Sequence, residues 1–241
     1  MAYRFAVERT DYGDLASGAV LRSAPGLPAF PVRLASEIFQ RAVELRGGEQ
    51  RAVVWDPLCG GGYLLTVLAM LHRERIAGLI ASDVDERALE VARANLGLLT
   101  AAGLAARRGE LADLADRYGK AAHLSALAAA DRLTGSGGDL VASLGRADVF
   151  DTAALRALLA PMPPDVVVTD IPYGEQVSWQ GGGKVEALLE SLDSVLPADA
   201  IVAVTGRGRR IESGRFRPAR SFRVGTRATA LFRIADRNGG S

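Results

Sequence analysis

The chain of 241 residues has one cysteine, Cys59, and two histidines, His72 and His123. A single cysteine excludes an internal disulfide framework and suits a reducing compartment. Because neither histidine has a cysteine cluster nearby, a structural zinc site is not expected. No apolar run is long enough to span a bilayer, and the N-terminus lacks the apolar core of a signal peptide. These absences predict a soluble cytoplasmic protein with no membrane partner.

Lysine is almost as scarce, since only Lys120 and Lys184 occur and arginine supplies nearly all of the positive charge. The net charge of +1 does not by itself indicate a nucleic-acid partner. Hydrophobic residues make up 49% of the chain, which is enough for the full core of one large α/β domain. We therefore predict a single domain over residues 1–241, with an N-terminal extension over residues 1–33.

The most informative segment follows an apolar β-branched run at residues 165–168, which predicts a buried strand. The sequence then reads Thr-Asp-Ile-Pro-Tyr-Gly. Asp170 and the carbonyl of Ile171 could each accept a hydrogen bond from an amino group. Pro172 would fix the local backbone, and the ring of Tyr173 could stack on a nucleobase. The alternative is an ordinary strand exit, where Asp, Pro and Gly are common.

A glycine turn upstream complements this segment. A strand at residues 53–56 ends on Asp56, and Cys59, Gly60 and Gly62 lead into an apolar-periodic helix. Glycines let the backbone pass close to a ligand. The third glycine of a dinucleotide fingerprint is replaced by Leu65, which weakens that reading. Cys59 is interpreted as a small residue that fits the turn, because no base partner for a nucleophile is evident.

Two further carboxylates follow predicted strands. Asp83 ends a strand at residues 78–82, about 20 residues after the glycine turn, where it could hold a ribose diol. Asp85 is then expected to cap the next helix. Asp148 could lie beside an adenine amino group, and Asp151 is the expected helix cap there. The alternative for Asp83 is that it is a second capping residue. The alternative for Asp148 is that its segment only leads into the helix that Asp151 and Thr152 cap.

The C-terminal part carries ten arginines against two acids. Its densest stretch, residues 206–220, contains glycine and proline with little apolar periodicity, and predicts a mobile basic loop after a strand at residues 200–204. Phosphate contact is the functional interpretation, and a solvated surface in an arginine-rich protein is the alternative. The candidate RNA-binding residues are Arg207, Arg209, Arg210, Arg215 and Arg217.

The order of elements is an alternation of strands and helices. A helix at residues 34–45 precedes the first strand, and an insertion at about 104–135 predicts two helices broken near residues 118–120. A strand at 140–144 follows, and strands at 222–224 and 228–234 flank residues 225–227 as a closing hairpin. Such alternation predicts an α/β fold with a mostly parallel sheet and helices on both faces. All four acids, Asp56, Asp83, Asp148 and Asp170, would then meet at its carboxyl edge.

These motifs resemble class I methyltransferases that act on a nucleobase nitrogen, and more closely the AviRa-type avilamycin-resistance 23S rRNA guanine methyltransferases. The N-terminal block is the specific part, since the glycine turn and Asp-Ile-Pro-Tyr occur in many methyltransferases. The resemblance covers most of the chain and is carried by residues 9–11, 15–21, 28–35, 56–57, 59–60, 62–68, 81–85, 147–151, 165–167, 170 and 172–175.

The resemblance implies a Rossmann-like, seven-stranded sheet, S-adenosylmethionine as methyl donor, and a guanine of 23S rRNA or the large ribosomal subunit as acceptor. Asp56, Cys59, Gly60, Gly62, Asp83 and Asp148 would then bind the cofactor. The catalytic residues would be Asp170, Pro172 and Tyr173. For guanine N2, acceptors would localise the amino lone pair, whereas for N1, Asp170 would act as a general base. A role in resistance to a ribosome-targeting orthosomycin antibiotic is also implied.

Two other functional classes stay open. An N6-adenine DNA methyltransferase or an N5-glutamine protein methyltransferase can share the same four-residue motif, although the basic loop argues against a protein substrate. A non-catalytic RNA-binding protein with a vestigial cofactor fold is the other, and the intact motif argues against it. We expect a monomer.

Overall fold

The computed structural model describes residues 3–8, 10–15, 18–134, 140–171 and 182–234, and for residues 182–184 it describes the backbone only. Within these residues, seven strands form one sheet in the order β3-β2-β1-β4-β5-β7-β6. The first five strands in that order are mutually parallel, and β7 is antiparallel to both of its neighbours. The predicted mostly parallel sheet is confirmed. The strands are β1 (Ala52–Asp56), β2 (Ile76–Asp83), β3 (Ala142–Arg146), β4 (Val166–Asp170), β5 (Ile201–Arg207), β6 (Arg220–Val224) and β7 (Arg227–Arg233).

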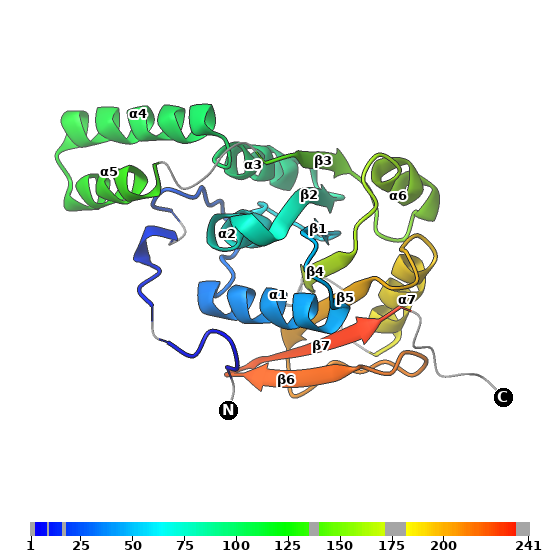
Figure 1. The fold of residues 1–241 in the computed structure, drawn as a ribbon. Coiled ribbons are helices and arrows are strands. Elements are labelled where there is room, and N and C mark those ends of the chain that lie inside the picture. Colours follow the sequence, from blue (N-terminus) through cyan, green and yellow to red (C-terminus); the bar gives the residue numbers. More distant parts are fainter. Residues whose placement is uncertain (1–2, 9, 16–17, 135–139, 172–181, 235–241) are drawn as a thin grey trace.

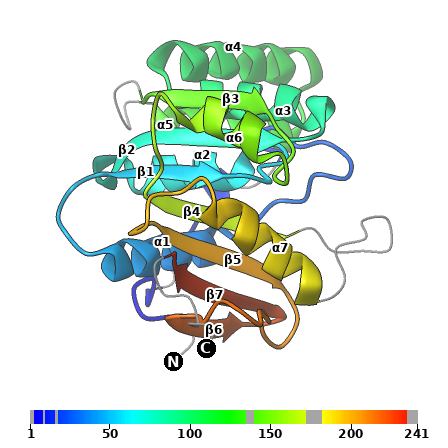
Figure 2. The same ribbon diagram turned by 90° about the vertical axis from the view of Figure 1, so that its right-hand side faces the viewer.

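Helices cover both faces of the sheet, as Figure 2 shows. One face carries α1 (Val32–Arg46), α2 (Tyr63–Leu71) and α3 (Glu86–Gly97), and the other carries α6 (Thr152–Leu159) and α7 (Gly182–Asp193). Two short 3-10 helices, η1 (Gly13–Leu15) and η2 (Arg73–Arg75), complete the connections. None of the described helices combines the length and apolar character needed to cross a membrane.

The central strands are apolar on both sides because both sides are covered. In β4, Val166 and Val168 pack into the core beneath α1, whereas Val167 packs into the core beneath α6 and α7. Trp55 of β1 lies fully buried in the second core, and its indole N–H donates to the Ser82 hydroxyl at 3.0 Å. The period-two alternation therefore fixes which of the two cores each side chain enters.

Several predicted boundaries were wrong by a few residues. The strand expected at 78–82 begins at Ile76, and the strand expected at 200–204 extends to Arg207, so the start of the predicted basic loop belongs to β5. The strand expected at 140–144 is β3, which begins two residues later. The hairpin turn was expected to include Arg227, but Arg227 is the first residue of β7 and pairs with Val224. The turn therefore has two residues, and its Gly225 adopts a φ of 58°. This difference places the Arg227 side chain in the sheet.

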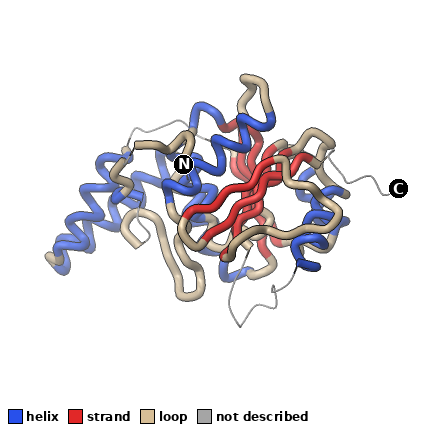
Figure 3. The backbone as a smooth tube through the Cα atoms, turned by 90° about the horizontal axis from the view of Figure 1, so that it is seen from below, coloured by secondary structure: helices blue, strands red, loops and turns tan. Residues whose placement is uncertain are grey.

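The predicted helical insertion is present as α4 (Ala101–Tyr118) and α5 (Ala121–Leu133), and the break lies where it was expected, at Gly119. It starts at Ala101, a few residues earlier than predicted, because the Thr100 hydroxyl caps α4 by accepting the amide of Gly103 at 3.0 Å. The two helices lie side by side and extend away from the sheet (Figures 1 and 3).

The helical insertion packs against the N-terminal extension. The guanidinium of Arg107 on α4 donates to the carbonyls of Ala19 and Val20, at 2.9 and 3.0 Å. On α5, Arg132 forms an ion pair with Asp14 of the extension at 2.5 Å. Two appendages that are far apart in the sequence thus support each other beside the sheet.

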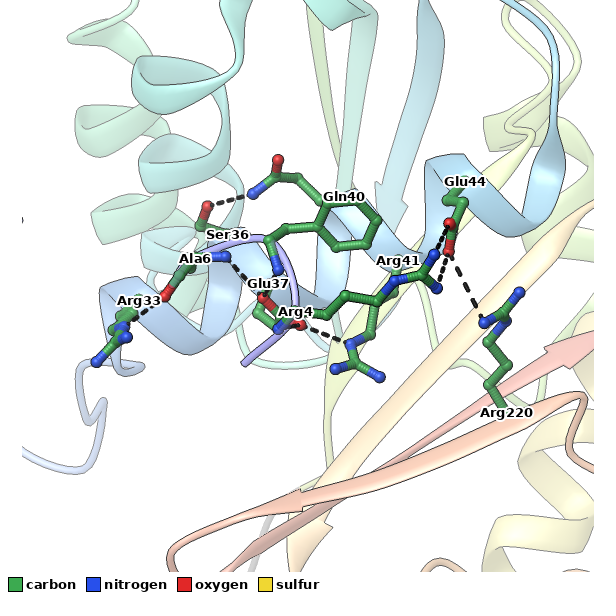
Figure 4. A network of polar contacts seen from close by, with 10 residues as sticks. Arg4, Ala6, Arg33, Ser36, Glu37, Gln40, Arg41, Glu44 and Arg220 are labelled. Carbon is green, nitrogen blue, oxygen red and sulfur yellow. Dashed lines mark hydrogen bonds and ion pairs between the residues drawn. The ribbon is translucent and has the colours of Figure 1, made fainter. Parts of the chain in front are cut away.

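A buried carboxylate on α1 anchors the start of the N-terminal extension (Figure 4). Glu37 is fully buried and accepts the consecutive backbone amides of Arg4, Phe5 and Ala6 at 2.6, 2.8 and 2.8 Å. The guanidinium of Arg41 also donates to it at 2.7 Å. Although burial opposes it, these donors lower the pKa of Glu37 below its usual value. The extension is therefore fixed to α1 by charge-assisted hydrogen bonds.

Candidate active site

A cavity of about 560 Å³ opens at the carboxyl ends of the parallel strands. Asp56, Asp83, Asp148 and Asp170 all line it, so the prediction that these four acids meet at one edge of the sheet is confirmed. Most of the remaining wall is apolar and includes Leu27, Phe30, Leu58, Val84, Val91, Val149 and Phe150. An apolar cleft with a few convergent carboxylates is suited to a cationic ligand that also has a flat apolar part.

The glycine turn contributes Gly60 and Gly61 to the lining of this cavity, whereas Gly62 is not among the lining residues. Gly60 and Gly62 have φ values of 51° and 67°, in the left-handed region that glycine occupies without strain. Gly62 also precedes α2, and a Cβ on it would lie 3.0 Å from the Cα of Ala92 on α3. This turn therefore needs glycine both for its own conformation and for the close approach of α3.

Asp83 ties the end of β2 to the glycine turn. One of its carboxylate oxygens accepts the amide of Gly60 at 2.8 Å, and the other accepts the amide of Asp85 at 3.0 Å. Asp85 caps α3 as predicted, by accepting the amide of Arg87 at 2.9 Å. Since Asp85 fills the cap position, the carboxylate of Asp83 stays at the cavity, with further lone pairs for a ligand.

Asp56 is the most buried of the four acids, with 3% of its surface exposed. Burial raises the pKa of Asp56 to about 7, and the carboxylates of Asp83 and Asp170 add to the rise. The amide of Leu58, which donates to Asp56 at 3.1 Å, opposes it only in part. An acid with this environment gains most from a cationic ligand placed beside it.

The two remaining predicted residues of this region have simpler surroundings. Cys59 is buried, and burial together with Asp56 and Asp83 raises the pKa of its thiol, which supports a packing role. Asp148 is exposed at the cavity wall and accepts the amide of Phe150 at 2.9 Å. The cap of α6 is Asp151, as predicted, so Asp148 is not needed for that role.

Asp170 ends β4 and lies against an arginine that the sequence did not indicate. Nη1 of Arg227 is 2.6 Å from each carboxylate oxygen of Asp170. The guanidinium also lies over the ring of Phe30, with its carbon 4.9 Å from the ring centroid. Pro172 and Tyr173 fall outside the described residues, so their roles stay predictions.

The start of the Asp-Ile-Pro-Tyr segment, at Ile171, depends on a glycine of the neighbouring strand. The amide of Ile171 donates to the carbonyl of Thr205 on β5 at 2.8 Å. A Cβ at the next residue, Gly206, would lie 2.8 Å from Cγ1 of Ile171. Gly206 therefore leaves the space that the Ile171 side chain occupies.

The N-terminal extension supplies part of the cavity wall, which the sequence reasoning missed. Its lining residues are Arg22, Gly26, Leu27, Pro28 and Phe30. Asn95 of α3 holds this segment in place by accepting the amide of Arg22 at 2.7 Å and donating to the carbonyl of Gly61 at 2.8 Å. The segment lacks helix or strand periodicity, so no local pattern predicts that it reaches the cavity. The one available signal was that the family resemblance includes part of this segment.

The arginine-rich segment, residues 207–217, runs from the end of β5 along the outside of α7. All five candidate RNA-binding arginines are exposed. Glu186 of α7 anchors the segment by accepting the amide of Arg215 at 2.8 Å, and Phe216 is buried beneath it. Arg210 pairs with Glu212 at 2.5 Å, and Arg215 pairs with Glu190. Contact with RNA stays a prediction for these arginines.

Comparison with known proteins identifies the family. A family model described as "rRNA methyltransferase AviRa" matches residues 1–227, which include the N-terminal extension, the helical insertion and the arginine-rich segment. The chain belongs to the AviRa family of rRNA methyltransferases. A curated relative, the 23S rRNA (guanine(2535)-N(1))-methyltransferase of Streptomyces viridochromogenes, is 52% identical over 98% of this chain and 97% of its own length.

Two solved structures of the rRNA methyltransferase aviRa from Streptomyces viridochromogenes, at 1.5 Å and 2.4 Å, are also similar. Each is 51% identical, covers 98% of this chain and 97% of its own chain, and superposes with a TM-score of 0.92. The class I methyltransferase fold that the sequence predicted is therefore confirmed, and the protein is an enzyme of the AviRa family.

Proposed function

We propose that this protein transfers a methyl group from S-adenosylmethionine to N1 of a guanine in 23S rRNA. The observation that carries the proposal is the nearly full-length match, at 52% identity, to the 23S rRNA (guanine(2535)-N(1))-methyltransferase of Streptomyces viridochromogenes. A match of this extent covers the N-terminal extension and the helical insertion as well as the core. Such additions to a common core usually determine which substrate is bound. By the same argument, we propose that the enzyme acts in the cytoplasm and protects the ribosome from an orthosomycin antibiotic.

The described residues fit S-adenosylmethionine. When bound, this cofactor supplies a methyl group on a positively charged sulfur. Asp56 is buried with a pKa of about 7 and would be stabilised as an anion by a neighbouring cation. Asp83, which lines the cavity at the end of β2, would accept hydrogen bonds from a ribose diol. The apolar wall with Val84, Val149 and Phe150 is suited to an adenine ring, and Asp148 lies beside it.

Methylation at N1 assigns a specific task to Asp170. The N1 nitrogen of guanine carries a hydrogen, and its lone pair becomes available only when that hydrogen is removed. Asp170 lines the cavity with a half-buried carboxylate that can accept this proton. The name of the curated relative favours N1 over the exocyclic N2, for which Asp170 would only orient the amino group. Tyr173 would stack on the base, as the sequence predicts.

The arginine-rich segment would hold the RNA. The segment begins at Arg207, at the end of β5, next to the end of β4 where Asp170 stands. A phosphate backbone bound along this segment would bring a nucleotide to the cavity mouth, and each contact would release a counterion. Of these arginines, Arg207 is the one that belongs to the sheet. It is the last residue of β5 and pairs in register with Arg227 of β7.

One assay separates the proposed activity from its alternatives. Purified protein is incubated with S-adenosylmethionine labelled on its methyl group and with deproteinised 23S rRNA, DNA or a protein extract in parallel. We expect label in 23S rRNA only, and about 10²–10⁴-fold less with Asp170→Ala, the loss expected when a positioned proton acceptor is removed. Label in DNA or protein would favour the other methyltransferase classes. RNA binding without any transfer would favour the non-catalytic alternative.

A further inference from the structure

Arg227 and Asp170 meet across a strand that lies between them. Asp170 is the last residue of β4 and Arg227 is the first residue of β7, and β5 separates the two strands in the sheet. The Arg227 side chain reaches over β5, and its Nη1 atom lies 2.6 Å from both oxygens of Asp170. This contact joins the strand that carries the catalytic segment to the closing hairpin.

The contact is enclosed and has a defined geometry. Arg227 is 8% exposed and lies over the ring of Phe30, which itself lines the cavity. A guanidinium between a carboxylate and an aromatic face has little freedom to change its orientation. A carboxylate has about four lone-pair sites, and Nη1 occupies only one on each oxygen of Asp170. The other sites can therefore serve a ligand in the cavity that Asp170 lines.

The charges around Asp170 oppose one another. Burial raises the pKa of Asp170, whereas Arg227 on β7 and Arg207 at the end of β5 lower it. Asp56 on β1 is the other acid of this group, and its own pKa is raised in part by Asp170. Arg227 is the arginine in direct contact, so it contributes most to keeping this half-buried carboxylate ionised.

We propose that Arg227 is the positioning residue of the acceptor site, which holds Asp170 ionised and oriented to accept the proton from guanine N1. This inference rests on the proposed function. The proton moves from N1 to a carboxylate oxygen of Asp170, and the electron pair left on N1 forms the new nitrogen–carbon bond. The carbon–sulfur bond of the donor breaks, and its electron pair stays on sulfur as the positive charge is lost.

A purely structural ion pair is the competing explanation. In that case Arg227 would only join β7 to β4, and its removal would lower the melting temperature without changing how the rate depends on pH. Loss of Arg227 raises the pKa of Asp170 under either explanation, but only a positioning residue makes this change visible in the rate. The two explanations therefore differ in the pH dependence of the rate, and the pKa of Asp170 measured without substrate tests the contact on which the proposal rests.

The first measurement is the titration of Asp170 by 13C NMR of its carboxyl carbon, in the protein without cofactor or RNA. Asp170→Asn assigns the signal. Arg227→Gln removes the charge, and Arg227→Met also keeps an unbranched side chain on Phe30, so it serves if the first variant does not fold. We expect the pKa of Asp170 to rise by about one unit or more in either variant. An unchanged pKa would overturn the proposal.

The second measurement is the pH dependence of 1-methylguanosine formation in 23S rRNA. Both Arg227 variants should move the acidic limb of kcat to higher pH and lower kcat at pH 7 by about 10–100-fold, with little change in KM for RNA. Arg227→Lys keeps a cation and should restore the wild-type limb. Arg223→Gln, which changes an exposed arginine of β6, is the matched control and should match the wild type.

The possible outcomes distinguish a failure of this inference from a failure of the proposed function on which it rests. If the wild type forms 1-methylguanosine and the Arg227 variants keep the wild-type limb, only the role of Arg227 is refuted. If the wild type forms no 1-methylguanosine, the proposed function fails and takes this inference with it.

Discussion

Replacement of Asp56 by asparagine should stabilise the protein at neutral pH while it weakens cofactor binding. Asp56 is fully buried, and its pKa is raised from the usual 3.8 to about 7. An unfolded chain ionises this group near pH 4, whereas the folded protein resists ionisation up to pH 7. Because of the raised pKa, the free energy of unfolding is higher at low pH than at neutral pH. This stabilisation is complete below about pH 4 and is lost between pH 4 and 7, as Asp56 becomes ionised in the folded protein.

The size of the effect follows from the shift of about three pKa units. At 1.36 kcal/mol per unit, the ionised carboxylate costs on the order of 4 kcal/mol above pH 7, and Asp56→Asn removes this cost. For a chain of this length, that corresponds to a melting temperature higher by roughly 8–16 °C at pH 8. The two proteins should unfold at nearly the same temperature at pH 4. Thermal unfolding at pH 4, 6 and 8 measures the trend.

The same variant should bind S-adenosylmethionine about 10–100-fold more weakly by calorimetry, because a charged hydrogen-bond partner is lost. Asp148→Asn is the control, since Asp148 lines the same cavity but is exposed, and it should show no gain in stability that depends on pH. A melting temperature of Asp56→Asn that is equal to or below the wild type at pH 8 would refute the account of a desolvated charge at this site.

Three other substitutions test separate parts of the structure. Gly62→Ala should lower stability by about 1–2 kcal/mol and weaken cofactor binding, because φ at Gly62 is 67° and the added Cβ would meet Ala92. If calorimetry shows an unchanged affinity for S-adenosylmethionine, the glycine turn is not part of the cofactor site. Changing both Arg209 and Arg210 to glutamine should lower RNA affinity and reduce the log–log salt slope by roughly one unit per lost contact, with cofactor affinity unchanged, and an unchanged slope would favour a solvated surface. Glu37→Gln should cost about 2–3 kcal/mol and speed proteolysis of the N-terminal extension, and equal proteolysis rates would show that its buried carboxylate does not anchor the segment.

The sequence predicted the parts of the site that follow regular strands. Asp56, Asp83 and Asp170 each end an apolar run, and the geometry of a parallel sheet then brings strand ends to one edge. The same reasoning predicted the break at Gly119, because a glycine between two helical patterns is a common C-terminal signal. Local pattern and sheet topology together were sufficient for these features.

The parts that the sequence did not predict depend on contacts between distant segments. Arg227 was assigned to a turn, because a glycine-containing stretch between two strand patterns fits a loop of three residues as well as one of two. Its partner Asp170 lies 57 residues away in the chain. Leu27 and Phe30 of the N-terminal extension carry no periodicity, and they line the cavity in an extension that distant side chains such as Asn95 hold in place.

Nucleoside analysis of treated 23S rRNA tests the central claim most directly. Deproteinised 23S rRNA is incubated with S-adenosylmethionine and either the wild type or Asp170→Ala, digested to nucleosides, and separated by mass-coupled chromatography against 1-methylguanosine and N2-methylguanosine standards. We predict 1-methylguanosine with the wild type and about 10²–10⁴-fold less with the variant. N2-methylguanosine as the only product, or equal amounts of 1-methylguanosine from both proteins, would contradict the assignment of Asp170 as the base that prepares guanine N1.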